Sequence, residues 1–206
     1  MTEQQRRTPS KLAQGRMRGV RVWSMLTALL FLTSCVPVLI VEGAPRFDVL
    51  VLGSPSSGPA PGAAEGLSEA LEEQSPTLRQ VPADIARFTE TRASLTPPRV
   101  VTSAARAARS LSARDVVVID TVLLERVLEG PEEVPLQRVR IQFRIRIIDA
   151  QSGFELATFL DQVRQGERLL LEPELPLLNE DPLYASLRDR AISALTPAIA
   201  TFLSSR

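Results

Sequence analysis

Few residues in this chain could carry out covalent or acid-base chemistry. Its 206 residues include no His, one Cys, Cys35, and one Lys, Lys11. The lack of His excludes Ser-His-Asp and Cys-His catalysis and His-ligated zinc. The lack of Lys beyond residue 11 excludes Schiff-base chemistry and a P-loop lysine in the rest of the chain. Carboxylates, hydroxyls and Arg remain, so we predict a protein that is not an enzyme and that holds no cofactor or metal.

The residues before Cys35 are typical of an export signal. Residues 1–21 contain six basic residues and one acid, and an apolar run follows from Val22 to Leu32. This order matches the basic and apolar regions of a secretory signal peptide. The next residues, Leu32-Thr33-Ser34-Cys35, resemble the lipobox of bacterial lipoproteins, which implies diacylglyceryl transfer to Cys35 and cleavage before it.

The lipobox predicts how the chain is organised. We expect residues 1–34 to be a lipoprotein signal peptide, residues 35–45 a lipid-anchored tether and residues 46–206 a single domain. Residues 22–41 carry no charge and are long enough to span a bilayer, so an uncleaved single-pass signal anchor is the alternative. Residues 35–206 contain 18 basic and 23 acidic residues, a net charge of −5, which together with 4% aromatic content argues against nucleic-acid binding.

Four arginines form the clearest candidate binding site in the predicted domain. Between residues 138 and 147, apolar residues occupy every odd position, and Arg138, Arg140, Arg144 and Arg146 occupy even ones. This alternation predicts a strand with one face on the core and one Arg-bearing face. The Arg stripe, as we call these four residues, could bind an acidic partner or lipid head groups through bidentate contacts. The alternative is a solvated face neutralised by neighbours such as Asp161 and Glu155.

Acidic residues offer weaker candidates. Glu125, Glu129, Glu132 and Glu133 could bind a cation, but their spacing fits no EF-hand, and we expect a solvated helix end and loop. The pair Asp149 and Glu155 could serve a carboxylate-based hydrolase, a function that we consider only as a remote alternative.

The surrounding pattern predicts an α/β domain with a layered, mixed sheet and helices packed on it. A β-hairpin occupies its C-terminal half, with its turn at 149–153, and a helix closes the chain. If the hairpin residues pair so that their numbers sum to 303, Ile147 faces Leu156 and Phe143 faces Leu160. We expect strands at 47–53, 115–120, 138–147 and 154–164, and helices at 63–74, 83–95, 102–111 and 183–203, the last kinked or restarted at Pro197.

The segment from Leu169 to Pro182 is apolar but contains Pro173 and Pro176, so it cannot be a regular helix throughout. We expect it to pack over the sheet edge, with an exposed apolar arm for a partner as the alternative.

Three pieces of the sequence together resemble a family. They are an Ala-rich helix leading into a Val-rich strand (104–121), a hairpin turn reading Ile148-Asp149-Ala150-Gln151-Ser152-Gly153, and the closing helix. In this order they resemble the envelope lipoproteins related to the curli secretion component CsgG, the penicillin-binding-protein activator LpoB and the amino-terminal domain of TolB, over residues 46–204. The auxiliary lipoproteins of ABC transporters are a second similar group. The chain departs from the first group in having Ala113-Arg114-Asp115 before the second strand, where Gly-Ala-Asp is usual.

The resemblance implies a non-enzymatic domain that docks onto an envelope partner protein. The alternative is an auxiliary subunit of an ABC-type lipid or solute transport system. We expect lipid anchoring through Cys35 at a membrane facing the periplasm, and a homo-oligomer is left open. The residue after Cys35 is Val36 and not Asp, so by analogy with lipoprotein sorting the outer membrane is allowed.

Overall fold

A computed structural model describes residues 45–54, 60–93, 95–131, 134–171 and 174–206. The chain divides into two compact units, residues 1–42 and 43–206, and all the described residues belong to the second unit. Cys35, its lipobox residues Leu32, Thr33 and Ser34, and the alternative span at 22–41 lie outside the described residues. Within the described ranges, no helix combines the length and apolar character needed to cross a membrane.

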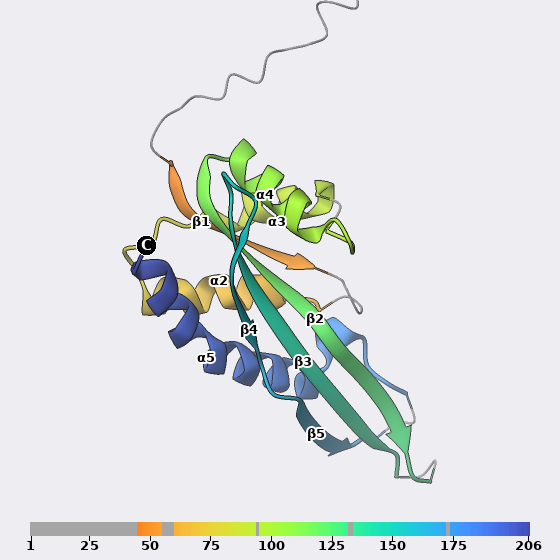
Figure 1. Cartoon of the computed structure of the whole chain (residues 1–206). Coiled ribbons are helices and arrows are strands. Elements are labelled where there is room, and N and C mark those ends of the chain that lie inside the picture. Colours follow the sequence, from red (N-terminus) through yellow and green to blue (C-terminus); the bar gives the residue numbers. More distant parts are fainter. Residues whose placement is uncertain (1–44, 55–59, 94, 132–133, 172–173) are drawn as a thin grey trace, which may run out of the picture. The chain divides into compact units, whose positions relative to one another are not determined.

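A five-stranded mixed sheet forms the centre of the second unit (Figure 1). β1 runs parallel to β2, and all the other pairs are antiparallel. The order is β1-β2-β3-β4, with β5 paired to the other half of β3. This arrangement confirms the predicted α/β class with its mixed sheet. The strands are β1 (Phe47–Ser54), β2 (Ala113–Glu129), β3 (Leu136–Asp149), β4 (Glu155–Leu160) and β5 (Arg164–Leu169).

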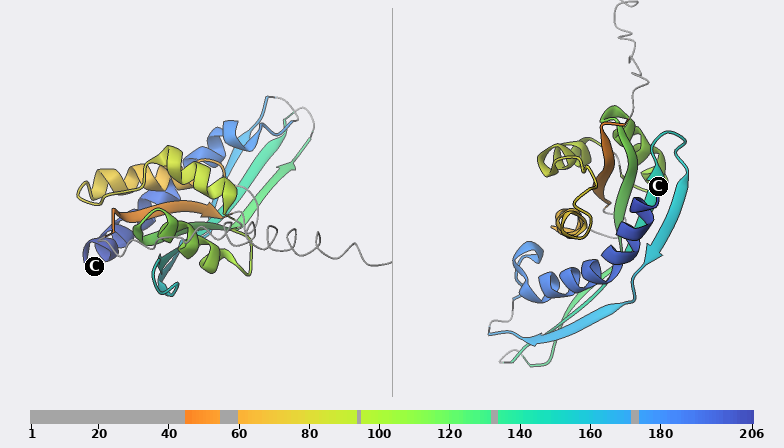
Figure 2. Two further views of the ribbon diagram at one scale, coloured as in Figure 1. Left: turned by 90° about the horizontal axis from the view of Figure 1, so that it is seen from above. Right: turned by 90° about the vertical axis from the view of Figure 1, so that its left-hand side faces the viewer.

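Helices cover both faces of this sheet (Figure 2). α2 and α5 pack on one face and α4 on the other, while α3 lies beside β1, next to both α2 and α4. The bounds predicted for the first helix are confirmed, and the closing helix runs through Pro197 without restarting. The helices are α2 (Ala63–Gln74), α3 (Ala83–Arg92), α4 (Val100–Ser110), the short 3-10 helix η1 (Leu178–Glu180) and α5 (Pro182–Ser204).

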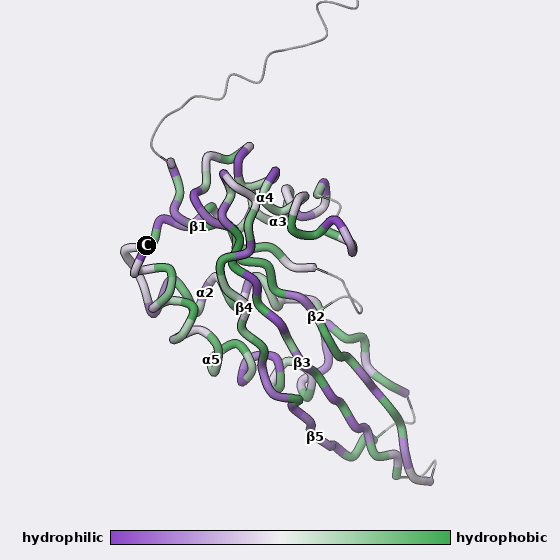
Figure 3. Tube along the Cα trace, in the orientation of Figure 1, coloured by the Kyte–Doolittle hydropathy of each residue, from purple (hydrophilic) through white to green (hydrophobic). Residues whose placement is uncertain are grey.

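Two aliphatic cores lie on opposite sides of the sheet. The odd-numbered residues of β3, from Val139 to Ile147, are completely buried beneath α5 and α2. The alternation that predicted this strand appears in Figure 3 as alternating colours along β3. On the other side, Val116 and Val118 of β2 pack against α4, whose alanines allow close approach to the sheet. Burial of aliphatic side chains on both faces is therefore the main source of stability.

β2 is longer than the sequence predicted. The strand expected at 115–120 extends to Glu129 and pairs with β3 along its whole length. A register shift between Thr121 and Leu123 interrupts the alternation of polar and apolar residues, and this bulge hid the second half of the strand. The helix end expected around Glu125 and Glu129 is thus wrong, because both residues lie on β2.

The hairpin register also differs from the prediction by one residue. Ile147 pairs with Ala157, and Arg144 pairs with Leu160, so the sum along most of the hairpin is 304. A register shift between Ile147 and Ile148 adds the extra residue next to the turn. The expected partner strand 154–164 is also divided, since β4 ends at Leu160 and β5 begins at Arg164.

Asp181 joins the start of α5 to the sheet. Its side chain is buried, and Oδ1 accepts hydrogen bonds from the backbone N–H groups of Leu183 at 3.0 Å and Tyr184 at 3.4 Å, as a helix N-cap does. Oδ2 lies 3.0 Å from Nη2 of Arg126 on β2 and accepts a hydrogen bond from the amide of Gln137 on β3. One carboxylate thus connects three elements.

β5 lies close to the first turn of α5 at a glycine. A Cβ atom at Gly166 would lie 2.7 Å from Cδ1 of Leu183 on α5. A larger residue at position 166 would therefore require the Leu183 side chain to shift.

Replacing Asp181 should destabilise the whole unit. Asp181→Ala removes the cap, the acceptor of the buried Gln137 amide and the carboxylate partner of half-buried Arg126, so we expect a loss of about 3–5 kcal/mol in the free energy of unfolding. Asp181→Asn keeps a capping oxygen and should cost less. Urea unfolding of the purified chain measures both, and equal stability of Asp181→Ala and the wild type would contradict this role.

Asp48 predicts a pH dependence of stability. Nη2 of Arg79 lies 3.0 Å from Oδ1 of Asp48, and the side-chain hydrogen bond from Arg79 holds the pKa of Asp48 below its ordinary value of 3.8. This contribution to stability is present above pH 3.8 and is lost as the pH falls through the lowered pKa. The difference in urea midpoint between wild type and Asp48→Asn should therefore shrink on acidification, while Glu72→Gln at an exposed position of α2 serves as the control.

Candidate functional site

The Arg stripe lies on the sheet face opposite α5, as the alternation predicted. Nη1 of Arg138 is 2.7 Å from Glu129, and its Nε is 2.8 Å from Glu167 on β5. Nη1 of Arg140 is 2.6 Å from Glu125. Two of the acidic residues considered for cation binding, Glu125 and Glu129, thus pair with half of the stripe, while Glu132 and Glu133 lie outside the described residues.

The other half of the stripe shares one buried carboxylate. Nη2 of Arg144 and Nη2 of Arg146 lie 3.1 Å and 2.7 Å from Oδ2 of Asp120, whose side chain is completely buried. Of the neighbours expected to neutralise the stripe, Glu155 is 4.0 Å from Arg146. Asp161 was the wrong choice, since it pairs with Arg164 at 2.6 Å.

All four stripe arginines therefore have carboxylate partners within the domain. An acidic ligand would have to compete with these carboxylates, and of these ion pairs the exposed ones of Arg138 and Arg140 contribute little to stability individually. Partner binding by the stripe stays a prediction. The crosslinking experiment described below compares the stripe with other surfaces.

The remaining carboxylate candidates do not form a catalytic arrangement. Asp149 accepts hydrogen bonds from the backbone N–H and hydroxyl of Ser152 and lies 3.3 Å from Arg206. The backbone hydrogen bond from Ser152 is the largest cause that lowers the pKa of Asp149, so this residue suits the ionised state and not proton donation. Glu155 instead accepts a hydrogen bond from Thr158. Among the residues that the structure describes, no group of three or more potential ligands could hold a metal ion.

The segment from 169 to 182 combines the two predicted alternatives: part of it packs on the domain, and part of it exposes apolar side chains. Leu170 is buried and Leu178 packs against the core beneath α5. Leu169, Leu171 and Leu177 are exposed. The described part of the segment therefore packs down at two points and presents apolar side chains between them.

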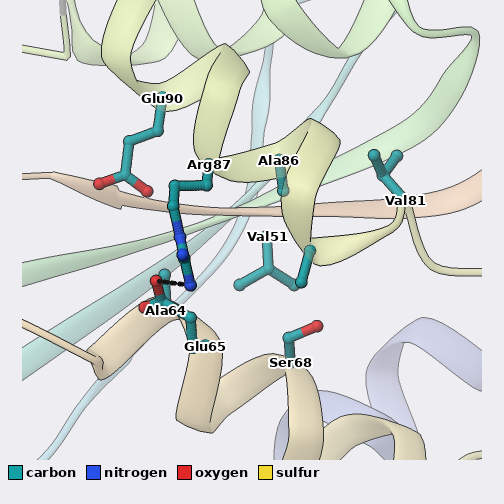
Figure 4. A pocket seen from close by; sticks show the side chains of 9 residues that line it. Val51, Ala64, Glu65, Ser68, Val81, Ala86, Arg87 and Glu90 are labelled. Carbon is teal, nitrogen blue, oxygen red and sulfur yellow. Dashed lines mark ion pairs between the residues drawn. The ribbon is translucent and has the colours of Figure 1, made fainter.

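A small cavity lies between β1, α2 and α3 (Figure 4). Its volume of about 20 Å³ is enough for roughly one water molecule. Glu90 accepts a hydrogen bond of 2.9 Å from the backbone N–H of Gly53, and burial raises the pKa of Glu90. Arg87 pairs with Glu65 at 3.2 Å, joining α3 to α2. These contacts position α3 and leave no room for a ligand.

A much larger groove lies between α3 and α4, with a volume of about 930 Å³. We refer to it as the α3–α4 groove. Phe88 lines it and is 57% exposed, and α3 has no fully buried residue along its length. The groove is lined by Ile85, Phe88, Thr89, Arg92, Ala93, Arg99, Thr102, Ser103, Arg106, Ala107, Ser110 and Leu111.

The charge of the α3–α4 groove is not neutralised locally. Its lining contains Arg92, Arg99 and Arg106 and no acidic residue. The guanidinium of Arg92 lies 4.2 Å from the centre of the Phe88 ring, as in a cation–π contact. None of the three forms an ion pair with a described carboxylate, unlike the Arg stripe. The groove thus combines apolar surface with three cations that are available for contact.

Sequence reasoning missed this groove. It assigned no role to Phe88, Arg92, Arg99 or Arg106. Two signals were available: the span from Arg99 to Ser112 contains three arginines and no acid, and the helix at 83–92 lacks an apolar stripe wide enough to be buried.

The buried carboxylate of Asp120, which Arg144 and Arg146 share, should contribute more to the free energy of unfolding than the exposed ion pairs of the stripe. Asp120→Asn removes the charge that Arg144 and Arg146 share, and we expect it to cost about 2–4 kcal/mol. Glu125→Gln removes only the exposed pair with Arg140 and should cost less than about 1 kcal/mol. Urea unfolding distinguishes the two, and a larger loss for Glu125→Gln would contradict the assignment.

Comparison with known proteins adds a structural likeness alone. No family model and no curated protein matches the sequence. A lipoprotein of Neisseria meningitidis, GNA1162, gives a TM-score of 0.41 at 14% identity over 75% of this chain and 99% of that chain. A variant PelC dodecamer of Paraburkholderia phytofirmans gives 0.39 at 18% identity over 75% and 90%. LpoB of E. coli, which belongs to the group that the sequence resembles, gives 0.37 at 14% identity over 80% and 81%. At these TM-scores we base no functional argument on the likeness.

Proposed function

We propose that this protein is a non-enzymatic, lipid-anchored domain of the cell envelope that docks onto a partner protein. The observation that carries the docking role is the α3–α4 groove. It exposes Phe88 beside Arg92, Arg99 and Arg106, and its lining supplies no acid to neutralise them. Aromatic side chains and Arg are the residue types most enriched at energetically important positions of protein interfaces.

The framework around the groove supports a binding surface. The inner side of α3 is fixed by two contacts. Glu90 is hydrogen bonded to Gly53 on β1, and Arg87 is paired with Glu65 on α2. The alanines of α4 pack against the sheet on the other side of the groove. The two walls are thus held from behind, so a partner need not order them on binding.

The anchoring role rests on the sequence. The basic segment, the apolar run and Leu32-Thr33-Ser34-Cys35 follow in the order that lipoprotein processing requires. Stable attachment takes more than one acyl chain, and the modification that the lipobox implies supplies several. The domain would then act at a membrane surface, where a bound partner is retained locally.

Substitution of Cys35 tests the anchor. Intact mass and membrane fractionation of the wild type, expressed in its own host, should give an acylated chain of residues 35–206 in the membrane fraction. Cys35→Ala should lose the acyl mass and change its processing, because it removes the acceptor sulfur. A full-length mass with unchanged membrane retention in Cys35→Ala would identify a signal anchor instead.

A further inference from the structure

We propose that the α3–α4 groove binds an acidic amphipathic helix of the partner protein. This inference rests on the proposed docking function and adds the chemistry of the segment that is bound. It follows from three properties of the groove: its length, its apolar surface and its uncompensated positive charge.

The length of the groove fits a helix of about three turns. On the α4 side, the lining runs from Arg99 through Ser103 and Ala107 to Leu111, which follows one face of α4 from end to end. At 1.5 Å per residue this face is about 18 Å long. A helix of about 12 residues spans the same distance.

The groove supplies apolar contacts that such a helix needs. Ile85 and Phe88 are 39% and 57% exposed, and both lie on the α3 side of the groove. Leu111 lies at the end of the α4 side. An apolar stripe with spacing i, i+3, i+4 and i+7 on the bound helix would cover these side chains, which is the usual mode of helix recognition in a groove.

The charge of the groove specifies acidic flanks on the bound helix. Arg99 and Arg106 are seven residues apart, so they lie about two turns apart on the same side of α4. Arg99 occupies the N-cap position of α4, where its side chain makes no capping hydrogen bond and where the positive end of the helix dipole opposes a cation. A carboxylate bound there relieves this repulsion, so carboxylates two turns apart fit the two arginines.

The concave shape of the site favours a protein segment over a lipid surface. Peripheral membrane binding places an apolar face of the protein into the bilayer, which requires a surface that projects outward. Here the apolar side chains and the arginines line a volume of about 930 Å³ between two helices. This volume is filled by a segment that enters it.

Site-specific photocrosslinking of the full chain in its own host tests the inference. Benzoylphenylalanine replaces Phe88 in the groove and, as a matched control, Leu160 on β4, because these residues are 57% and 58% exposed. A third position, Arg140, samples the Arg stripe. The crosslinked peptides are then identified by mass spectrometry.

We expect the Phe88 position to crosslink an Asp- and Glu-rich partner segment with helical apolar spacing. Arg99→Glu with Arg106→Glu should abolish that adduct. The same pair should raise the Kd of the synthetic partner peptide at least about tenfold in fluorescence anisotropy. Arg190→Glu, on the opposite face of the sheet, should leave both unchanged, and circular dichroism of each variant checks its fold.

Several results would overturn the inference. They are no adduct at Phe88, an adduct with lipid, an adduct with a second copy of this chain, or a partner segment that lacks acidic residues. Failure of the groove assignment alone can be distinguished from failure of the docking function. If Phe88 gives no adduct but Arg140 or Leu160 captures an envelope protein in a Cys35-dependent manner, docking stands and the groove assignment alone fails.

Discussion

The attachment of α5 to the sheet is the constraint on which the rest of this structure depends. The odd-numbered residues of β3 from Val139 to Ile147 are all apolar and must be covered, and α5 is the helix that extends along them. Asp181 caps that helix and at the same time contacts Arg126 on β2 and Gln137 on β3. The position of the helix and the pairing of the long hairpin are therefore mutually dependent.

The surface carries two groups of arginines that differ in whether carboxylates neutralise them. Those on β3 face carboxylates on β2 or β5, so that part of the sheet is electrostatically balanced. Arg92, Arg99 and Arg106, which line the α3–α4 groove, form no ion pair with a described carboxylate, and they surround exposed apolar side chains. In a domain whose expected mature form is acidic overall, this local positive charge would favour a partner with a complementary surface under the proposed function.

The sequence predicted the elements better than their connections. Period-two alternation identified β3, and flanking Gly and Pro residues fixed the bounds of α2, because these signals are local. The bulges near Thr121 and Ile147 each insert a residue that no local pattern reveals, so the length of β2 and the register of β4 were wrong. The α3–α4 groove depends on two helices that meet only in the folded chain. The sequence of either helix alone does not show whether an Arg is solvated or lines a binding surface.

The position of α3 has an evolutionary consequence. No side chain of this helix is fully buried, and its attachment to the unit relies on few contacts, such as those of Glu90 and Arg87. Substitutions on its outer surface therefore change the free energy of folding little, while they alter what the groove can recognise. The buried residues of both aliphatic cores come from other elements, so related chains can diverge in this helix while they keep the same architecture.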